Sequence, residues 1–240
     1  WAASSTRLNF PLTKWGMPPR RGIVVSYMRK RNTEYSRMNI HNIFNPSFAL
    51  AAFAMTTLAF AEHDWQGVSL DESAQAYLTS TGSNWYPANV PDGDSLRFMK
   101  GGTTVTFDSM INAKGYVWTG ATGGEFTGGD GEDLWCVWQS LGGSADYGIS
   151  ANCKLAVSDA SDQRGNLWIK SGSYTFSNLD FGLGNGPAKV KVDGGSLTSS
   201  GPAYVAGKPE AKLEIGGGHL KVNDQMYIAN VAGATGIVHV

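Results

Sequence analysis

The chain has 240 residues, 42% of them hydrophobic and 16% charged, which excludes a disordered chain and one that lies in a membrane throughout. Glycine is the outlier, with 31 residues and no strict triplet period. Collagen is therefore excluded, and many tight turns between short apolar runs predict an all-β protein.

Positive charge is concentrated at the front of the chain. Residues 1–37 hold eight lysines and arginines against Glu34 alone, so the remainder carries 11 basic and 19 acidic side chains, a net charge of −8. An acidic body repels phosphate backbones, and we expect no nucleic-acid partner.

An export signal is predicted at residues 28–61. The apolar stretch FALAAFAMTTLAFA (48–61) is too short to span a bilayer and ends in Ala59-Phe60-Ala61, the A-x-A pattern of a cleavage site. Met28 supplies an initiator with basic residues directly behind it, so residues 1–27 are interpreted as upstream read-through. The mature chain is expected to begin near Glu62. A buried core helix is the alternative interpretation of the apolar stretch.

Residues 62–165 are predicted to form an N-terminal cap and irregular early coils. A Pro-Asp-Gly turn (91–93) precedes an apolar strand, and TTVTF (103–107) alternates as a strand does. Leu155 and Val157 resemble the apolar pair that opens a later coil, but they come too soon before Leu167 to open a coil of full length. We therefore expect an insertion here, in an atypical end that shields the edges of the sheet.

Two candidate binding sites lie within this segment. Trp118, Trp135 and Trp138 could stack on sugar rings, or they could fill the core instead. GGDGEDLW (128–135) contains one copy of a calcium-binding nonapeptide pattern, with Asp130 and Asp133 as the ligands. A single copy lacks the neighbouring coil that completes such a cage, and a solvated acidic turn is the alternative. No cofactor is expected.

Cys136 and Cys153 are the only cysteines in the chain. An oxidising compartment permits a disulfide between them, and two buried thiols are the alternative. The chain has no CxxC pair and no cluster of Cys and His, so a structural zinc site is not expected.

A repeat occupies residues 166–240. KVKVDGGSLTSSGPAYVAG (189–207) aligns with a second copy, KLEIGGGHLKVNDQMYIAN (212–230). The matching positions are apolar residues and one glycine, in the pairs Val190 and Leu213, Val192 and Ile215, Gly195 and Gly218, Leu197 and Leu220, and Val205 and Ile228. An earlier copy begins at Leu167, and Val238 begins another after a slightly longer interval.

This period predicts a parallel β-helix, a β-solenoid with coils of about 23 residues. A unit this short cannot bury its apolar face alone and must stack on the next unit. Spacings of seven, eight and eight residues between apolar positions indicate three short strands per coil, joined by glycine-containing corners. An antiparallel sandwich is the alternative fold. Since the sequence ends inside a further coil, we expect these coils to be truncated at the C-terminus.

The segment NWYPANVPDGDSLRF…GGTTVTF resembles the opening segment of autotransporter-passenger-like proteins, which are large exported bacterial proteins with autotransporter-associated β-strand repeats. VDGGSLTSSGPAYVAG and IGGGHLKVNDQMYIAN are similar to their coils. The resemblance covers most of residues 80–107 and 166–240. It implies a right-handed parallel β-helix, displayed at or released from a Gram-negative cell surface. The C-terminal translocating barrel and sorting tail of that family are absent from this sequence.

We expect a non-enzymatic, surface-displayed or secreted module, similar to an adhesin or a stalk. No GxSxG, HExxH or P-loop motif occurs. Asp159, Asp162 and Arg164 are the residues that a polysaccharide lyase or glycoside hydrolase of this fold would use, but they fit a polar loop more simply. A carbohydrate-binding or polysaccharide-degrading β-helix protein is the alternative function.

The expected partners are surface glycans, or other copies of the chain that pair with exposed solenoid edges. Contact with a membrane is expected only through the signal peptide or through an anchor outside this sequence.

Overall fold

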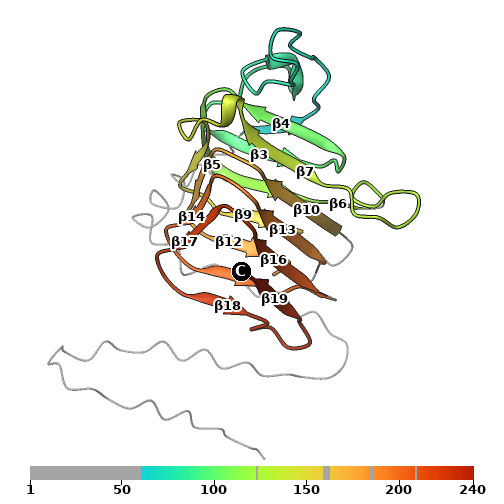
Figure 1. Ribbon diagram of the computed structural model, residues 1–240, viewed down its shortest axis with the longest axis vertical. Coiled ribbons are helices and arrows are strands. Elements are labelled where there is room, and N and C mark those ends of the chain that lie inside the picture. The colour runs from blue at the N-terminus through green and yellow to red at the C-terminus, as the bar shows by residue number, and fades with distance from the viewer. Residues whose placement is uncertain (1–60, 123, 159–162, 184–185, 209) are drawn as a thin grey trace, which may run out of the picture. The chain divides into compact units, whose positions relative to one another are not determined.

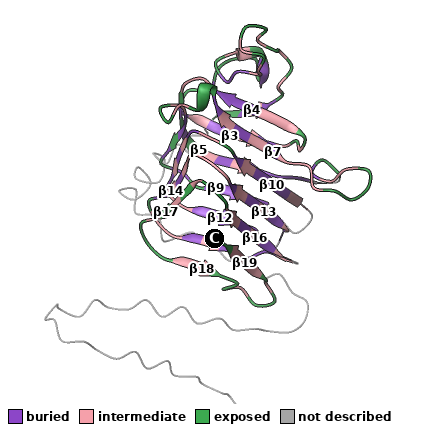
Figure 2. Cartoon of the chain, in the orientation of Figure 1, coloured by how far each residue is buried: buried purple, intermediate pink, exposed green. Residues whose placement is uncertain are grey.

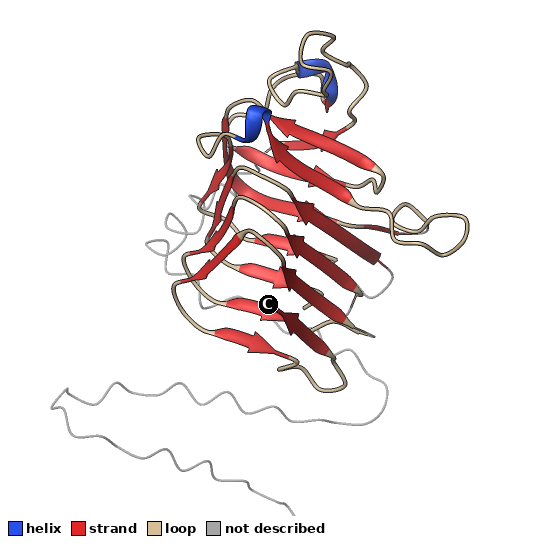
Figure 3. Cartoon of the chain, viewed as in Figure 1, coloured by secondary structure: helices blue, strands red, loops and turns tan. Residues whose placement is uncertain are grey.

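The computed structural model describes residues 61–240 apart from 123, 159–162, 184–185 and 209, all within one compact unit, Thr57–Val240 (Figure 1). The predicted signal segment lies outside these residues. Nineteen β-strands and two short 3-10 turns make up the regular structure of the described part, without an α-helix (Figure 3). No helix there has the length and apolar character needed to cross a membrane. The prediction of an all-β protein is confirmed.

The strands form parallel sheets that surround one core on three faces. Face 1 is a seven-stranded sheet, seen in Figure 1 as a ladder of arrows. Its strands, in spatial order, are β4 (Thr103–Phe107), β7 (Cys136–Ser140), β10 (Gln163–Ile169), β13 (Ala188–Val192), β16 (Ala211–Ile215) and β19 (Gly236–His239). The short strand β6 (Ala121–Thr122) pairs antiparallel with β10.

Faces 2 and 3 belong to one twelve-stranded sheet that divides within the long strand β5 (Met110–Thr119). Face 2 contains residues 110–113 of β5, then β8 (Gly148–Ala151), β11 (Ser173–Phe176), β14 (Ser196–Ser199) and β17 (His219–Val222). Face 3 contains β3 (Asp94–Phe98), residues 117–119 of β5, β9 (Leu155–Val157), β12 (Leu179–Phe181), β15 (Ala203–Val205) and β18 (Met226–Ile228). Each winding of the chain visits the three faces in turn.

The register of the sheets matches the repeat in the sequence. On face 1, Val190 pairs with Leu167 before it and with Leu213 after it, and each of these pairs is separated by one period of the repeat. The predicted matches on the other faces are also neighbours: Leu197 with Leu220, and Val205 with Ile228. All these pairings are parallel, which excludes the antiparallel sandwich.

Two windings precede the repeat, and their longer connections hide them in the sequence. β4 and β5 form one winding, and β7, β8 and β9 form the next. Cys136 pairs with Leu167 although they lie further apart in the chain than one period of the repeat, because the connection between β7 and β8 contains the 3-10 turn η2 (Leu141–Gly143). Leu155 and Val157 do not open a coil: they lie on face 3.

Residues 61–98 form a cap on the first winding. Strand β1 (Glu62–Trp65) pairs parallel with β3 and antiparallel with β2 (Trp85–Tyr86), which follows the 3-10 turn η1 (Gly82–Asn84). Trp65 and Trp85 meet edge to face, with 5.1 Å between ring centroids, and the Trp85 indole donates to the carbonyl of Thr79 at 2.9 Å. The Trp85 indole thus buries its apolar surface while its polar edge finds a partner.

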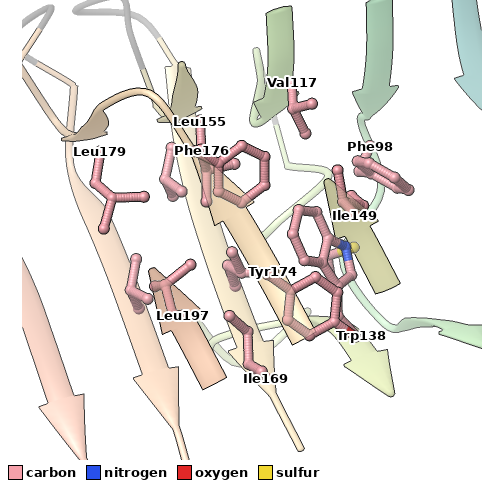
Figure 4. Close-up of a cluster of buried hydrophobic side chains, with 14 of the residues drawn as sticks. Phe98, Val117, Trp138, Ile149, Leu155, Ile169, Tyr174, Phe176, Leu179 and Leu197 are labelled. Atoms are coloured by element: carbon pink, nitrogen blue, oxygen red, sulfur yellow. The ribbon is translucent and has the colours of Figure 1, made fainter. Parts of the chain in front are cut away.

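The core is a stack of inward side chains enclosed by the three faces. Figure 2 colours these buried residues purple along the strands. Strand alternation places every second residue inside, so β13 buries Ala188, Val190 and Val192 and leaves its two lysines partly exposed. Figure 4 shows a cluster of these side chains around Trp138 and Tyr174. Each fully buried Leu, Ile, Val or Phe stabilises the fold by about 1.5–3 kcal/mol relative to exposure.

Candidate functional site

The three candidate tryptophans have different surroundings. Trp138 is 0% exposed, with its ring centroid 4.9 Å from that of Phe98 and 5.2 Å from that of Tyr174. A side chain so placed cannot contact a ligand, so Trp138 fills the core. Trp118 lies on the outer side of face 3, and Trp135 lies beside face 1; both are half-buried. The structure therefore does not bring the three indoles together.

Trp135 packs against a second indole on face 1. Its ring meets that of Trp168 edge to face, at 6.3 Å between centroids. The ammonium groups of Lys170 and Lys191 lie 4.1 and 4.8 Å from the centroid of the Trp168 ring, in cation–π contacts. The Trp168 indole donates to Asp193 at 3.0 Å. Both indoles of this face are thus already in contact with neighbouring side chains.

Asp133, one of the two predicted calcium ligands, already faces two cations. Its carboxylate pairs with Lys189 at 2.5 Å and with Arg164 at 3.5 Å. Asp130 is exposed in the turn before it, and the described residues contain no group of three or more His, Cys, Asp or Glu side chains suited to a metal. Because both cations repel a divalent ion, the geometry favours the solvated acidic turn over a calcium site.

A buried asparagine fastens the chain before β7 to face 1. Asn166 on β10 is 0% exposed, and its amide donates to the carbonyls of Phe126 and Leu134, both at 3.0 Å. Phe126 is itself 1% exposed and belongs to the core. This connection is thus packed against the sheet.

Cys136 and Cys153 are free thiols, so the disulfide considered above is not formed. Cys136 begins β7 on face 1, whereas Cys153 lies in the turn between faces 2 and 3, and both are buried. Burial raises the pKa of the Cys136 thiol to about 12 and that of Cys153 to about 11. Because the thiolate is the reactive form, neither cysteine is suited to act as a nucleophile.

The residues considered for catalysis are dispersed. Asp159 and Asp162 lie outside the described residues, and Arg164 pairs with Asp133 at face 1. The histidines between residues 61 and 240 lie on three separate strands, β1, β17 and β19. The three histidines therefore do not share one site, and each of two of them lies near a carboxylate of its own: His63 is 3.5 Å from Asp94, and His239 is 3.8 Å from Glu214.

Face 3 carries an unbroken outward row of side chains, one from each strand. Parallel pairing aligns Asp64, Arg97, Trp118, Ala156, Asp180, Tyr204 and Tyr227 in this order. Neighbouring members of the row are about 4.8 Å apart along the sheet. Ala156 is the smallest of them, and it lies between the larger side chains of Trp118 and Asp180.

Beside Ala156 the surface is hollowed. The hollow has a volume of about 330 Å³ and is lined by Arg97, Tyr116, Trp118, Lys154, Ala156 and Gln163. We call it the face 3 hollow. It joins residues of β3, β5 and β9, which parallel register brings side by side, with the turn before β9 and with Gln163 of β10 from the other sheet.

Ion pairs hold the wall of the hollow nearest the cap. The Arg97 guanidinium donates to both carboxylate oxygens of Asp64, at 2.5 and 2.8 Å, and lies 3.0 Å from Glu62. Tyr116 donates to Glu62 at 2.5 Å; burial, followed by this hydrogen bond, raises the pKa of Tyr116 to about 12. Tyr116 is therefore a neutral hydroxyl group at physiological pH.

A buried carboxylate lies next to the hollow on the opposite side. The Asp180 side chain is 9% exposed, and one of its oxygens lies 3.2 Å from the ammonium group of Lys154. Its other oxygen, Oδ1, is buried and has no hydrogen-bond partner among the described residues. Lys154 is more open to solvent, with 46% of its side chain exposed.

Face 2 differs from face 3 in its outward side chains. Its row consists of small polar residues and ends at a lysine: Asn112, Ser150, Thr175, Thr198 and Lys221. The outward row of face 2 thus contains no aromatic side chain. On face 1, the Trp135 and Trp168 indoles pack against each other, and Lys170, Lys191 and Asp193 contact Trp168.

The sequence analysis found Trp118 but missed the rest of the face 3 row. One signal was present: Tyr204 and Tyr227 occupy the same offset in the two aligned copies, and their rings stack at 5.0 Å with an interplanar angle of 9°. No comparable signal marked Lys154 and Asp180, which come from different windings and meet only through the register.

Comparisons with known proteins do not assign a function to this chain, so the inference of function rests on the residues described above. No protein-family profile, no curated protein and no solved structure matches the chain.

Proposed function

We propose that this protein is an exported, non-enzymatic surface module built as a right-handed parallel β-helix with coils of about 23 residues. The observation that carries the proposal is the constant register of β10, β13 and β16, whose inward residues stack winding upon winding. Contacts between neighbouring windings stabilise such a stack, which holds long outward faces in place. Its role is display and contact, as in an adhesin or a stalk.

The position of the first strand supports export. β1 begins at Glu62, directly after the predicted cleavage site. Glu62 is already part of the fold, because its carboxylate pairs with Arg97 and accepts the hydrogen bond from Tyr116. Cleavage after Ala61 would therefore release a chain that keeps every residue of β1. Display at a Gram-negative surface belongs to the same proposal and rests on the resemblance to autotransporter passengers.

Expression of the chain from Met28 in a Gram-negative host tests export. We expect the product outside the cytoplasm to begin at Glu62, as read by N-terminal sequencing and intact mass. Ala61→Arg is the matched control, because a large charged residue replaces the small residue that cleavage requires. A mature product that retains residues upstream of Ser47, or a wild-type chain that stays in the cytoplasm, would contradict the proposal.

The same purified protein tests the non-enzymatic role. We expect no new reducing ends and no unsaturated sugars after prolonged incubation with a panel of neutral and acidic polysaccharides. Turnover of any one of them would contradict this part of the proposal while leaving export intact.

A further inference from the structure

Three surface hollows differ in their size and in the side chains that line them. The one at Trp135 is the smallest of the three, at about 140 Å³, and its charged groups are paired, Lys189 with Asp133 and Lys212 with Glu214. A second, of about 290 Å³, is bordered by Trp65, whose side chain is 4% exposed and belongs to the core. The face 3 hollow, at about 330 Å³, combines a half-buried indole with Lys154, which pairs with Asp180 but keeps 46% of its side chain exposed.

We propose that the face 3 hollow is a binding site for a neutral sugar unit of a polysaccharide, with Trp118 as its platform. The inference deepens the proposed contact role by naming a ligand class, and it does not depend on export. Its volume is near the lower end of the range for small-molecule sites, as suits one or two sugar rings bound at a surface.

Trp118 offers carbon surface rather than a hydrogen-bond donor. Its Nε1 is buried and has no hydrogen-bond partner among the described residues, and it faces the backbone near Gly120. The part of the indole that lines the hollow is therefore its hydrocarbon ring. The C–H face of a sugar ring is complementary to such a surface, because an aromatic ring is negative on its face and the sugar C–H groups are weakly positive.

Polar groups from three side chains stand around this platform. Tyr116 donates to Glu62 and keeps lone pairs that accept hydrogen bonds, while Lys154 holds an ammonium group on a side chain that is 46% exposed and can donate. Gln163 also lines the hollow, and its Oε1 is buried and has no hydrogen-bond partner among the described residues. Donors and acceptors together suit hydroxyl groups, which need both.

The charged side chains in and around the hollow favour a neutral ligand. The two cations of the hollow, Arg97 and Lys154, are matched against three carboxylates: Asp64, Glu62 and Asp180. The surplus is negative, so a sugar acid would meet repulsion from Asp180, which is nearly buried and only partly neutralised. The face 3 row continues beyond Asp180 through Tyr204 and Tyr227, whose rings stack on each other outside the hollow.

Isothermal titration calorimetry with neutral hexasaccharides tests the site. The probes are the hexamers of cellulose, maltose-type glucan, xylan and mannan, with oligogalacturonate of equal length as the charged counterpart. We expect at least one neutral hexamer to bind and the oligogalacturonate to bind at least about tenfold more weakly. Trp118→Ala is expected to weaken the neutral complex at least about tenfold, since a central tryptophan carries much of the energy of a binding site.

Two further variants separate the site from general damage. Ala156→Leu fills the hollow without removing the indole and is expected to weaken binding as strongly, whereas Trp118→Phe keeps a ring and is expected to weaken it less. Trp168→Ala is the matched control, because it removes a half-buried indole from face 1 and should leave the affinity within about twofold. Far-UV circular dichroism confirms that each variant is folded.

Loss of affinity in Trp118→Ala and Ala156→Leu, with retention in Trp168→Ala, would support the glycan site. Undiminished binding by folded Trp118→Ala, tighter binding of the oligogalacturonate, or silence of all neutral hexamers would overturn it. None of these results bears on the mature N-terminus, so failure of the glycan site is distinguishable from failure of the export proposal.

Discussion

At the scale of single residues, strand parity decides what each side chain can do. Trp138 has the same strand parity as the buried residues Cys136 and Ser140 and faces the core, whereas Trp118 lies between two inward residues, Val117 and Thr119, and faces out. The same residue type therefore becomes core in one strand and a candidate platform in another. A shift of one residue in either strand would exchange these roles.

The cysteines provide a test at this scale. At pH 8 we expect both thiols of the folded protein to react slowly with Ellman's reagent, because burial raises the pKa of Cys136 to about 12 and that of Cys153 to about 11. Cys153, at 6% exposed against 0% for Cys136, should react first. Urea should release two reactive thiols, and Cys153→Ala should release one. Recovery of no thiol from the unreduced, unfolded protein would show a disulfide instead.

These raised pKa values also set the sign of a pH effect. The folded pKa of each thiol is higher than its ordinary value of about 8.5, so the unfolded state loses the proton first as pH rises. The stabilisation is fully present below about pH 8.5 and is lost as the pH rises through the folded pKa values of about 11 and about 12.

At the scale of elements, the corner between faces 1 and 2 requires glycine. Gly172 and Gly195 occupy equivalent corners of successive windings with φ of +99° and +69°, and Ser196 donates its N–H to the carbonyl of Gly172 at 2.9 Å. The backbone of Gly195 is left-handed and packs directly against the Gly172 corner of the preceding winding, which leaves no room for a side chain. This explains why the repeat has a glycine at position 195.

Gly195→Ala is expected to destabilise the protein, by about 1–3 kcal/mol from the backbone alone. A Cβ there would also overlap the carbonyl oxygen of Gly172. Gly129→Ala is the matched control, because the added methyl group meets nothing within 4 Å. Urea unfolding measures both variants. Equal stabilities for the two would show that this corner is not under the constraint described.

At the scale of the whole molecule, parallel pairing makes one winding interchangeable with the next. Ala188 is the register partner of Ala211, so the two occupy the same position in successive windings. Deletion of residues 188–210 joins Pro187 to Ala211 and lets β16 take the place of β13 against β10. We expect this variant to fold, with a denaturant m-value lowered in proportion to the lost surface.

Deletion of residues 188–199 is the control for this experiment. It removes about half a winding and brings strands of different faces into one row, so the inward residues lose their register. We expect loss of the cooperative unfolding transition, measured by circular dichroism. If both deletions fold equally well, stacking in register is not what stabilises the molecule.

The sequence by itself determined the all-β class and the in-register windings from Leu167 onward, because apolar residues and glycines recur there at equal offsets. Where connections lengthen, the period is lost, and the windings of β4 and β7 became visible only in the structure. The period also could not show which of Trp118 and Trp138 is buried.

Only the tertiary structure decided the composition of face 3. Lys154, Asp180 and Trp118 belong to three different windings, and nothing in their local sequence links them. Parallel register brings them to one surface, because each winding returns the chain to the same face about 4.8 Å further along. Local pattern sets which residues face outward, whereas pairing between distant strands sets which of those residues become neighbours.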